Sequence, residues 1–246
     1  MSIADEITRL YGVREDIFSA IEDKGVTVPS GSKLDDAPDL IAAISGGGGN
    51  IPALGKVTVG GRDYPYVQYS GMLFTILNLD FIPEGSTIEL GVNGAPETPA
   101  AWYYNNDEAT YGWNGKQYGL LYNKYAIPEI NAALTDGWHV MTFADNYNCM
   151  RQDMYYNTFN WQNANKYKDP NIAGWNGTGE MGFMVRPSGE RTEAGVFTAI
   201  ETQWRVWLYE SANTTYRIST TPGEWTTGSQ SKNAKYGCSL RLAKIP

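Results

Sequence analysis

A run of four glycines, Gly46 to Gly49, divides the chain into two segments whose hydrophobic periodicities differ. This composition is typical of a flexible linker. Before the run, apolar residues recur at helical spacing. After it, they alternate with polar residues in short stretches separated by turn residues. We therefore expect a small helical module over residues 1–45, a glycine linker over 46–50 and a main domain over 51–246.

The apolar residues of the amino-terminal module lie three or four positions apart, which predicts an amphipathic helix. They are Ile3, Ile7, Leu10, Ile17 and Ile21, with Val13 and Phe18 beside them. Ser2 is the candidate N-cap, Gly25 is the expected end, and a second short helix is expected over 37–44. A module this small buries little apolar surface alone. We expect it to associate with copies of itself, with a trimer as one candidate state, or with another structural protein. The alternative is a helical hairpin packed on the main domain.

The main domain carries the signals of many short strands and two helices. Turns are expected at Gly60–Gly61 and Ser70–Gly71, a helix begins near Pro128, and a second helix is expected over 144–161. Residues 93–118 have the composition of a loop. Further strands are expected within 86–92, 179–189, 196–201, 204–210, 214–219 and 236–245. Short mixed or antiparallel strands with two helices indicate an α+β fold.

Charge and hydropathy exclude several classes of partner. The net charge is −8 with no basic cluster, which argues against nucleic acid and against anionic membrane surfaces. No apolar run approaches the roughly 20 residues that span a bilayer, so we expect no membrane insertion. The first residues lack the apolar stretch of a signal peptide, and we expect synthesis in a bacterial cytoplasm without one.

Few residues are suited to catalysis or metal binding. His139 is the only histidine, and Cys149 and Cys238 are far apart in the sequence, so we expect no zinc site, no other metal, no cofactor and no catalytic residue. The two cysteines either pair or stay reduced. We interpret His139 as a packing residue. We interpret Glu201 as a group that makes a structural hydrogen bond to a neighbouring loop, and the alternative is that Glu201 is a functional acid.

Seven segments between residues 61 and 244, taken in order, carry a resemblance to a known family. They are GRDYPYVQYSGMLFTILNLDF (61–81), YGLLYNKYAI (118–127), DGWHVMT (136–142), AGWNGTGEMGFMVRPSGER (173–191), VFTAIE (196–201), WRVWLYE (204–210) and KYGCSLRLAK (235–244). Residues 56–246 resemble the Fibrobacter-type major paralogous domain family, which is similar to the formylglycine-generating-enzyme branch of the C-type lectin fold. The resemblance implies a C-type-lectin-like fold. Residues 1–44 resemble the amino-terminal module of phage tail-fibre proteins.

The chain departs from the enzymatic and calcium-binding branches of that fold. Formylglycine-generating enzymes use two neighbouring cysteines, and neither cysteine here lies in a matching motif. Calcium-dependent lectins carry Glu-Pro-Asn or Gln-Pro-Asp and a Trp-Asn-Asp triplet. Here Trp113-Asn114-Gly115 and Trp175-Asn176-Gly177 lack the carboxylate. The expected function is therefore non-enzymatic binding, with a formylglycine-type oxidase or a structural module without a ligand as alternatives.

The family includes the variable proteins of diversity-generating retroelements, whose surface residues are diversified near the carboxyl end. The resemblance implies a phage tail-fibre tip or surface adhesin, in the virion or at the cell surface, that binds a host-surface protein or glycan. Alternation places Trp204, Val206 and Leu208 on one strand face, and Trp207 and Tyr209 on the other. Tyr, Trp, Ser, Thr and Asn suit binding surfaces. The expected ligand-binding residues are Thr202, Gln203, Trp207, Tyr209, Ser211, Asn213, Thr215, Tyr216, Trp225, Thr227, Ser229, Ser231 and Asn233. Trp102 and Tyr104 either border this surface or pack a long loop.

Overall fold

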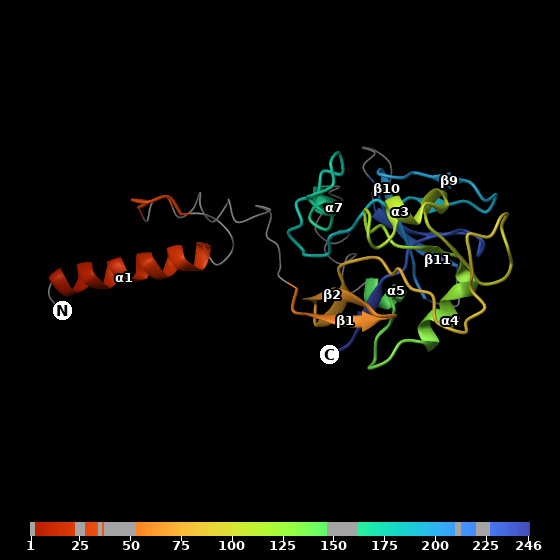
Figure 1. Cartoon of the computed structure of the whole chain (residues 1–246), viewed down its shortest axis with the longest axis horizontal. Coiled ribbons are helices and arrows are strands. Elements are labelled where there is room, and N and C mark those ends of the chain that lie inside the picture. The colour runs from red at the N-terminus through yellow and green to blue at the C-terminus, as the bar shows by residue number, and fades with distance from the viewer. Residues whose placement is uncertain are drawn as a thin grey trace. The chain divides into compact units, whose positions relative to one another are not determined.

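A computed structural model describes residues 3–22, 28–33, 36, 53–146, 162–209, 213–219 and 227–246. The chain forms two compact units, Met1–Asn50 and Ile51–Pro246. Figure 1 shows helix α1 (Ile3–Glu22) in the first unit and the sheets and short helices of the second. The expected N-cap Ser2, the expected end at Gly25 and the expected helix over 37–44 lie outside the described residues.

The first unit has a small apolar core of its own. Phe18 and Ile21 of α1 are buried, and Ile17 and Val28 pack against them. Val28 precedes a turn that is closed by a hydrogen bond from the Ser32 amide to the Pro29 carbonyl at 3.1 Å. Ile7, Leu10, Tyr11 and Val13 of α1 are exposed.

The first and last strands of the second unit share one antiparallel sheet, in the order β1-β2-β3-β13-β7. The strands are β1 (Gly55–Val59), β2 (Arg62–Tyr69), β3 (Met72–Thr75), β13 (Leu242–Lys244) and β7 (His139–Val140). The hairpin turns lie at Gly60–Gly61 and Ser70–Gly71, where all four residues have positive φ. Such two-residue turns match the twist of the strands they join. The expected turns are confirmed.

Three smaller sheets complete the unit. They are β10 (Gln203–Trp207), β11 (Thr214–Ser219) and β12 (Thr227–Ser231); β4 (Glu89–Leu90), β5 (Ala100–Trp102) and β6 (Leu121–Tyr122); and β8 (Glu190–Arg191) with β9 (Phe197–Thr198). Residues 93–118, expected as loop, contain β5, the 3₁₀ helix η2 (Tyr104–Asn106) and α3 (Glu108–Tyr111). That prediction was wrong in part, because two-residue pairings carry no periodicity that a sequence could reveal.

The helices of the second unit are short. Besides η2 and α3, the described residues form η3 (Lys124–Ala126), α4 (Ile127–Ala132), α5 (Phe143–Asn146) and α7 (Gln162–Asn165). Pro128 lies in the first turn of α4, as expected. Helix α5 covers the start of the second expected helix, and 147–161 lie outside the described residues. Several small sheets with a few helices make this an α+β protein.

The carboxyl-terminal segment connects the sheets of the second unit, and strand β10 lies between two apolar clusters. Gly237, Cys238 and Ser239 form bridges with β8, β6 and β10 respectively, before the chain enters β13. Trp204 and Val206 belong to one buried apolar cluster, whereas Trp207 belongs to another. Strand β10 is therefore buried on both faces.

Candidate binding surface

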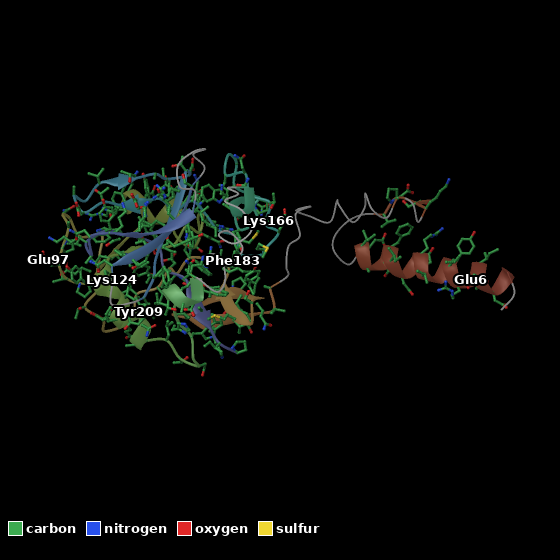
Figure 2. All side chains as sticks on the ribbon, turned by 180° about the vertical axis from the view of Figure 1, so that it is seen from behind. Glu6, Glu97, Lys124, Lys166, Phe183 and Tyr209 are labelled. Atoms are coloured by element: carbon green, nitrogen blue, oxygen red, sulfur yellow. The ribbon has the colours of Figure 1, made fainter. Side chains whose placement is uncertain are left out.

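The burial of β10 corrects the expected exposure of Trp207. Its side chain is 0% exposed, and its indole N–H donates to the Tyr122 carbonyl at 2.7 Å. The predicted alternation along the strand is correct, because Trp204 and Trp207 lie in different clusters. Alternation, however, does not distinguish a strand with one solvent face from one between two cores. Tyr209, which is labelled in Figure 2, is partly buried and packs against the cluster that holds Trp207.

Five more of the expected ligand-binding residues are buried, which also corrects that prediction. They are Gln203, Thr215, Tyr216, Trp102 and Tyr104. The Thr215 hydroxyl donates to the Gln230 carbonyl at 3.1 Å, and the Trp102 indole donates to the Val92 carbonyl at 2.7 Å. These side chains contribute hydrogen bonds and packing within the fold, since neighbouring strands and loops cover them.

The other expected residues are distributed as follows. Thr202, Ser231 and Asn233 are exposed, and Asn213 is half-buried. Thr227 and Ser229 lie in β12, and their side chains are not among those described. Ser211 and Trp225 lie outside the described residues. Ser231 and Asn233 are therefore available to solvent at the end of β12, and Thr202 precedes β10.

The structure brings aromatic side chains from distant segments together beside Thr202. We call Tyr104, Tyr111, Tyr118, Phe197 and Ile200 the aromatic surface. The Tyr104 ring lies 5.4 Å from Tyr111 and 5.3 Å from Phe197, and Tyr111 lies 5.8 Å from Tyr118. Tyr111, Phe197 and Ile200 are half-buried, with Tyr104 and Tyr118 buried. Figure 1 shows α3 and β9, which supply Tyr111 and Phe197, near each other at one edge of the unit.

An ion pair borders the aromatic surface. Lys116 pairs with Glu201, and the side chains are 43% and 52% exposed. The Lys116 ammonium lies 5.7 Å from the Tyr111 ring centre and 5.8 Å from that of Tyr118. The hydrogen bond with Glu201 raises the pKa of Lys116. An exposed pair of this kind contributes ~1 kcal/mol at most to stability. Glu201 thus makes the expected bond to a neighbouring loop, and both groups remain accessible to a ligand.

The turn that carries Ile200 and Glu201 is held in an uncommon backbone conformation. Ala199 and Glu201 have φ of 59° and 61°, in the left-handed region that non-glycine residues rarely adopt. The Glu201 amide donates to the Pro187 carbonyl at 2.9 Å, and the Gln203 amide donates to the Ala199 carbonyl at 3.0 Å. Such conformations cost about 1–3 kcal/mol each and persist only where the surroundings enforce them. The turn is therefore ordered before any ligand arrives.

The side chains best suited to chemistry are engaged in structure. His139 Nε2 lies 2.9 Å from Asp145 Oδ2 and Nδ1 lies 3.2 Å from the Gly137 carbonyl. The bond to Asp145 raises the pKa of His139. Cys238 is a free and fully buried thiol whose pKa is raised by burial. Across the described ranges, no three His, Cys, Asp or Glu side chains gather where they could hold a metal.

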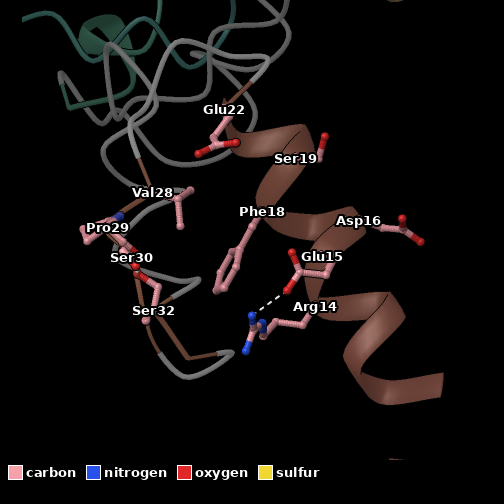
Figure 3. Close-up of a pocket in the computed structure, with 11 residues that line it drawn as sticks. Arg14, Glu15, Asp16, Phe18, Ser19, Glu22, Val28, Pro29, Ser30 and Ser32 are labelled. Carbon is pink, nitrogen blue, oxygen red and sulfur yellow. Dashed lines mark hydrogen bonds and ion pairs between the residues drawn. The ribbon is translucent and has the colours of Figure 1, made fainter. Parts of the chain in front are cut away.

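One hollow of about 490 Å³ lies in the first unit, between α1 and residues 28–32 (Figure 3). Its walls carry charged and hydroxyl side chains such as Glu15, Asp16 and Ser30, and Phe18 faces into it. None of the expected ligand-binding residues lies there. Among the described residues, no helix has both the length and the apolar character needed to cross a bilayer.

No family model, curated protein or solved structure matches this chain. The site is therefore defined by its own geometry. Sequence reasoning selected Tyr104 and Thr202, and it missed Tyr111, Phe197 and Lys116. Tyr111 ends α3 and Lys116 lies in the turn that follows it, whereas Phe197 lies in β9, and only the tertiary fold places these two segments together.

Proposed function

We propose that this chain is a non-enzymatic ligand-binding protein with a C-type-lectin-like domain, of the kind carried by phage tail-fibre tips or surface adhesins. Two features of the fold support the proposal. The first and last strands of the domain lie in one sheet, and a separate three-stranded sheet precedes the final strand. The proposed partner is a host-surface protein or glycan, and the proposed location is the virion or the cell surface.

The observation that carries the proposal is the aromatic surface with its polar border. Half-exposed Tyr111 and Phe197 offer flat apolar area and lose little rotamer entropy when a ligand docks. Lys116, Glu201 and Thr202 offer charged and hydroxyl groups around them. An aromatic centre with a polar border is the arrangement that concentrates binding energy at interfaces.

The chemistry of Cys238 favours binding over the oxidase alternative. Formylglycine-type oxidation requires reactive thiolates, and a thiolate needs a polar or positively charged setting with access to solvent. Cys238 is 0% exposed, and burial raises its pKa. A chain with Cys149→Ser and Cys238→Ser that keeps its ligand binding, beside a wild-type chain that takes up no copper, would exclude the oxidase.

The proposal is tested with the purified full chain on an array of bacterial glycans and immobilised outer-membrane proteins. We expect saturable binding to a small set of probes, and the bound probe should be recovered with unchanged mass. Chemical conversion of a bound probe would contradict the non-enzymatic assignment. Absence of saturable binding to every probe would favour a structural module instead.

A further inference from the structure

Arg191 of β8 is a buried cation whose guanidinium makes few hydrogen bonds. The residue is 3% exposed, and its Nη2 donates to the Gly94 carbonyl at 2.5 Å. The Nε and Nη1 atoms are buried and have no hydrogen-bond partner. A buried donor left unsatisfied costs about 1–3 kcal/mol, and more when it carries charge. Such a group is accounted for when a ligand, an ion or a water completes its hydrogen bonds.

The surroundings of this guanidinium are aromatic rather than acidic. Its central carbon lies 4.2 Å from the centre of the Trp102 ring and 5.5 Å from that of Phe197. In the described part of the chain, no carboxylate forms an ion pair with Arg191, and the adjacent Glu190 pairs with Arg205. Burial lowers the pKa of Arg191, with no nearby negative charge to oppose the shift. An uncompensated positive charge therefore lies beside two flat apolar rings.

Glycine residues from two surface segments lie against the guanidinium. Gly94 belongs to the segment that precedes β5, and Gly195 belongs to the turn between β8 and β9, with φ of 78° and 83° respectively. A Cβ atom on Gly195 would lie 2.9 Å from Arg191 Nη2 and 3.3 Å from the Gly94 carbonyl oxygen. Gly94 and Val196 are exposed, so both segments border solvent. Two loops that carry no side chain at these glycines therefore separate the guanidinium from solvent, and an outward movement of either loop exposes it.

We propose that Arg191 binds the carboxylate of a uronic acid residue in the ligand, after these two loops move apart. This inference rests on the proposed function and deepens it, because Phe197 lies beside Arg191 and also belongs to the aromatic surface. A guanidinium offers five N–H donors in a fork that matches the two oxygens of a carboxylate, and Arg191 uses one of them on Gly94. Away from bulk water, each bond of such a pair is roughly twice as strong as a bond between neutral groups.

The distance of 5.5 Å between the Arg191 guanidinium and the Phe197 ring favours a carboxylate that is attached directly to a ring. A uronate carries its carboxylate on the pyranose ring, so one sugar residue can pair with Arg191 and lay its C–H face on Phe197 at the same time. Its hydroxyl groups then suit the charged and hydroxyl side chains that border the aromatic surface. An aspartate or glutamate of a protein partner has its carboxylate on a flexible chain with no flat face, and ordering that chain has an entropy cost.

The test is an NMR titration of the full chain, followed at the Arg191 Nε–H signal, which is identified by its absence from the Arg191→Met chain. The probes are the methyl glycosides of glucuronate and galacturonate, the neutral parent of each, and N-acetylglutamate. We expect one uronide to shift the signal saturably and to bind roughly 10-fold or more tightly than its neutral parent. Arg191→Met, checked for cooperative unfolding, should lose this preference. Lys56→Met removes an exposed charge from β1, outside the aromatic surface, and should keep the preference.

Equal affinity of the wild-type chain for each uronide and its neutral parent would overturn the proposal, and this comparison needs no variant. A folded Arg191→Met chain that keeps the preference would overturn the assignment to Arg191. N-acetylglutamate that binds as tightly as the better uronide would overturn the assignment to a sugar and favour a protein acid. Saturable binding of neutral probes on the array, without any preference for uronides, would remove this inference and leave the proposed function standing. Absence of saturable binding to every probe in both experiments would remove both.

Discussion

Lys168 is a buried cation, and its replacement provides a quantitative test of the packing around it. The side chain is 3% exposed, its ammonium donates to Asn165 Oδ1 at 2.9 Å, and it lies 4.6 Å from the centre of the Trp175 ring. None of the described carboxylates forms an ion pair with it. Burial lowers the pKa of Lys168 from 10.5 to about 8.

That shift sets the size of the expected effect. A difference of about 2.5 pKa units between unfolded and folded chain corresponds to ~3 kcal/mol at neutral pH. The hydrogen bond and the ring contact that the ammonium makes return ~1–2 kcal/mol of this. We therefore expect Lys168→Met, which conserves volume and removes the charge, to stabilise the protein by ~1–2 kcal/mol at pH 7.

The stability that Lys168→Met gains over the wild-type chain must fall as pH rises above 8. Below pH 8 both folded and unfolded chains carry the charged lysine, so the full penalty is present. Between pH 8 and 10.5 the folded chain loses the proton first, and wild-type stability rises relative to the variant by up to ~1.4 kcal/mol per pH unit. Urea unfolding of both chains from pH 7 to pH 10 measures this.

The matched control is Lys166→Met, which removes a half-exposed lysine 3.4 Å from Glu180. We expect a change of less than ~1 kcal/mol with no trend above pH 8. A Lys168→Met chain that is less stable than wild type at pH 7, or a difference that stays constant to pH 10, would refute the reasoning.

Three further predictions concern buried polar groups. Arg241→Met leaves backbone carbonyls of two segments without their hydrogen-bond donor. The free energy of unfolding in urea should therefore fall by ~3–5 kcal/mol, and a fall of less than about 1 kcal/mol would contradict this. Asp145 raises the pKa of His139, so the pair stabilises the fold below pH 6.5 and less as pH rises through the folded pKa. His139→Gln should therefore cost more stability at pH 5.5 than at pH 8.5, and equal costs would refute it. In a Cys149→Ser chain, a thiol reagent should label Cys238 only after unfolding, and rapid labelling of the native chain would show that the thiol is accessible.

Local features of the fold were predictable where backbone conformation depends on particular residues. Gly60–Gly61 and Ser70–Gly71 require positive φ, and both hairpins formed where expected. Strand β12 (Thr227–Ser231) was missed, because its sequence TGSQS lacks β-branched and aromatic residues beyond Thr227. Strand β12 forms because it pairs with β11, and the residues of β12 alone do not reveal that pairing.

The site was less predictable than the fold, and β10 explains why. Its alternation was correct, but the exposure of Trp207 was not, because the segments that cover it, around Tyr122 and Cys238, are distant in sequence. The half-buried rings of the aromatic surface are instead Tyr111 of α3 and Phe197 of β9, which are far apart in the sequence. A surface assembled from distant segments of the chain has no spacing that a single sequence can reveal.

Docking of a ligand on the aromatic surface is tested by a paired comparison of two variants. Phe197→Ala removes one of the two half-buried rings of the aromatic surface, and Leu54→Ala removes a 57% exposed apolar side chain outside that surface. Both are titrated against the probe that the wild-type chain binds most tightly on the array. We expect Phe197→Ala to weaken binding by roughly 10-fold or more and Leu54→Ala to leave the Kd unchanged. Equal affinity of the two variants, with both folded, would contradict it.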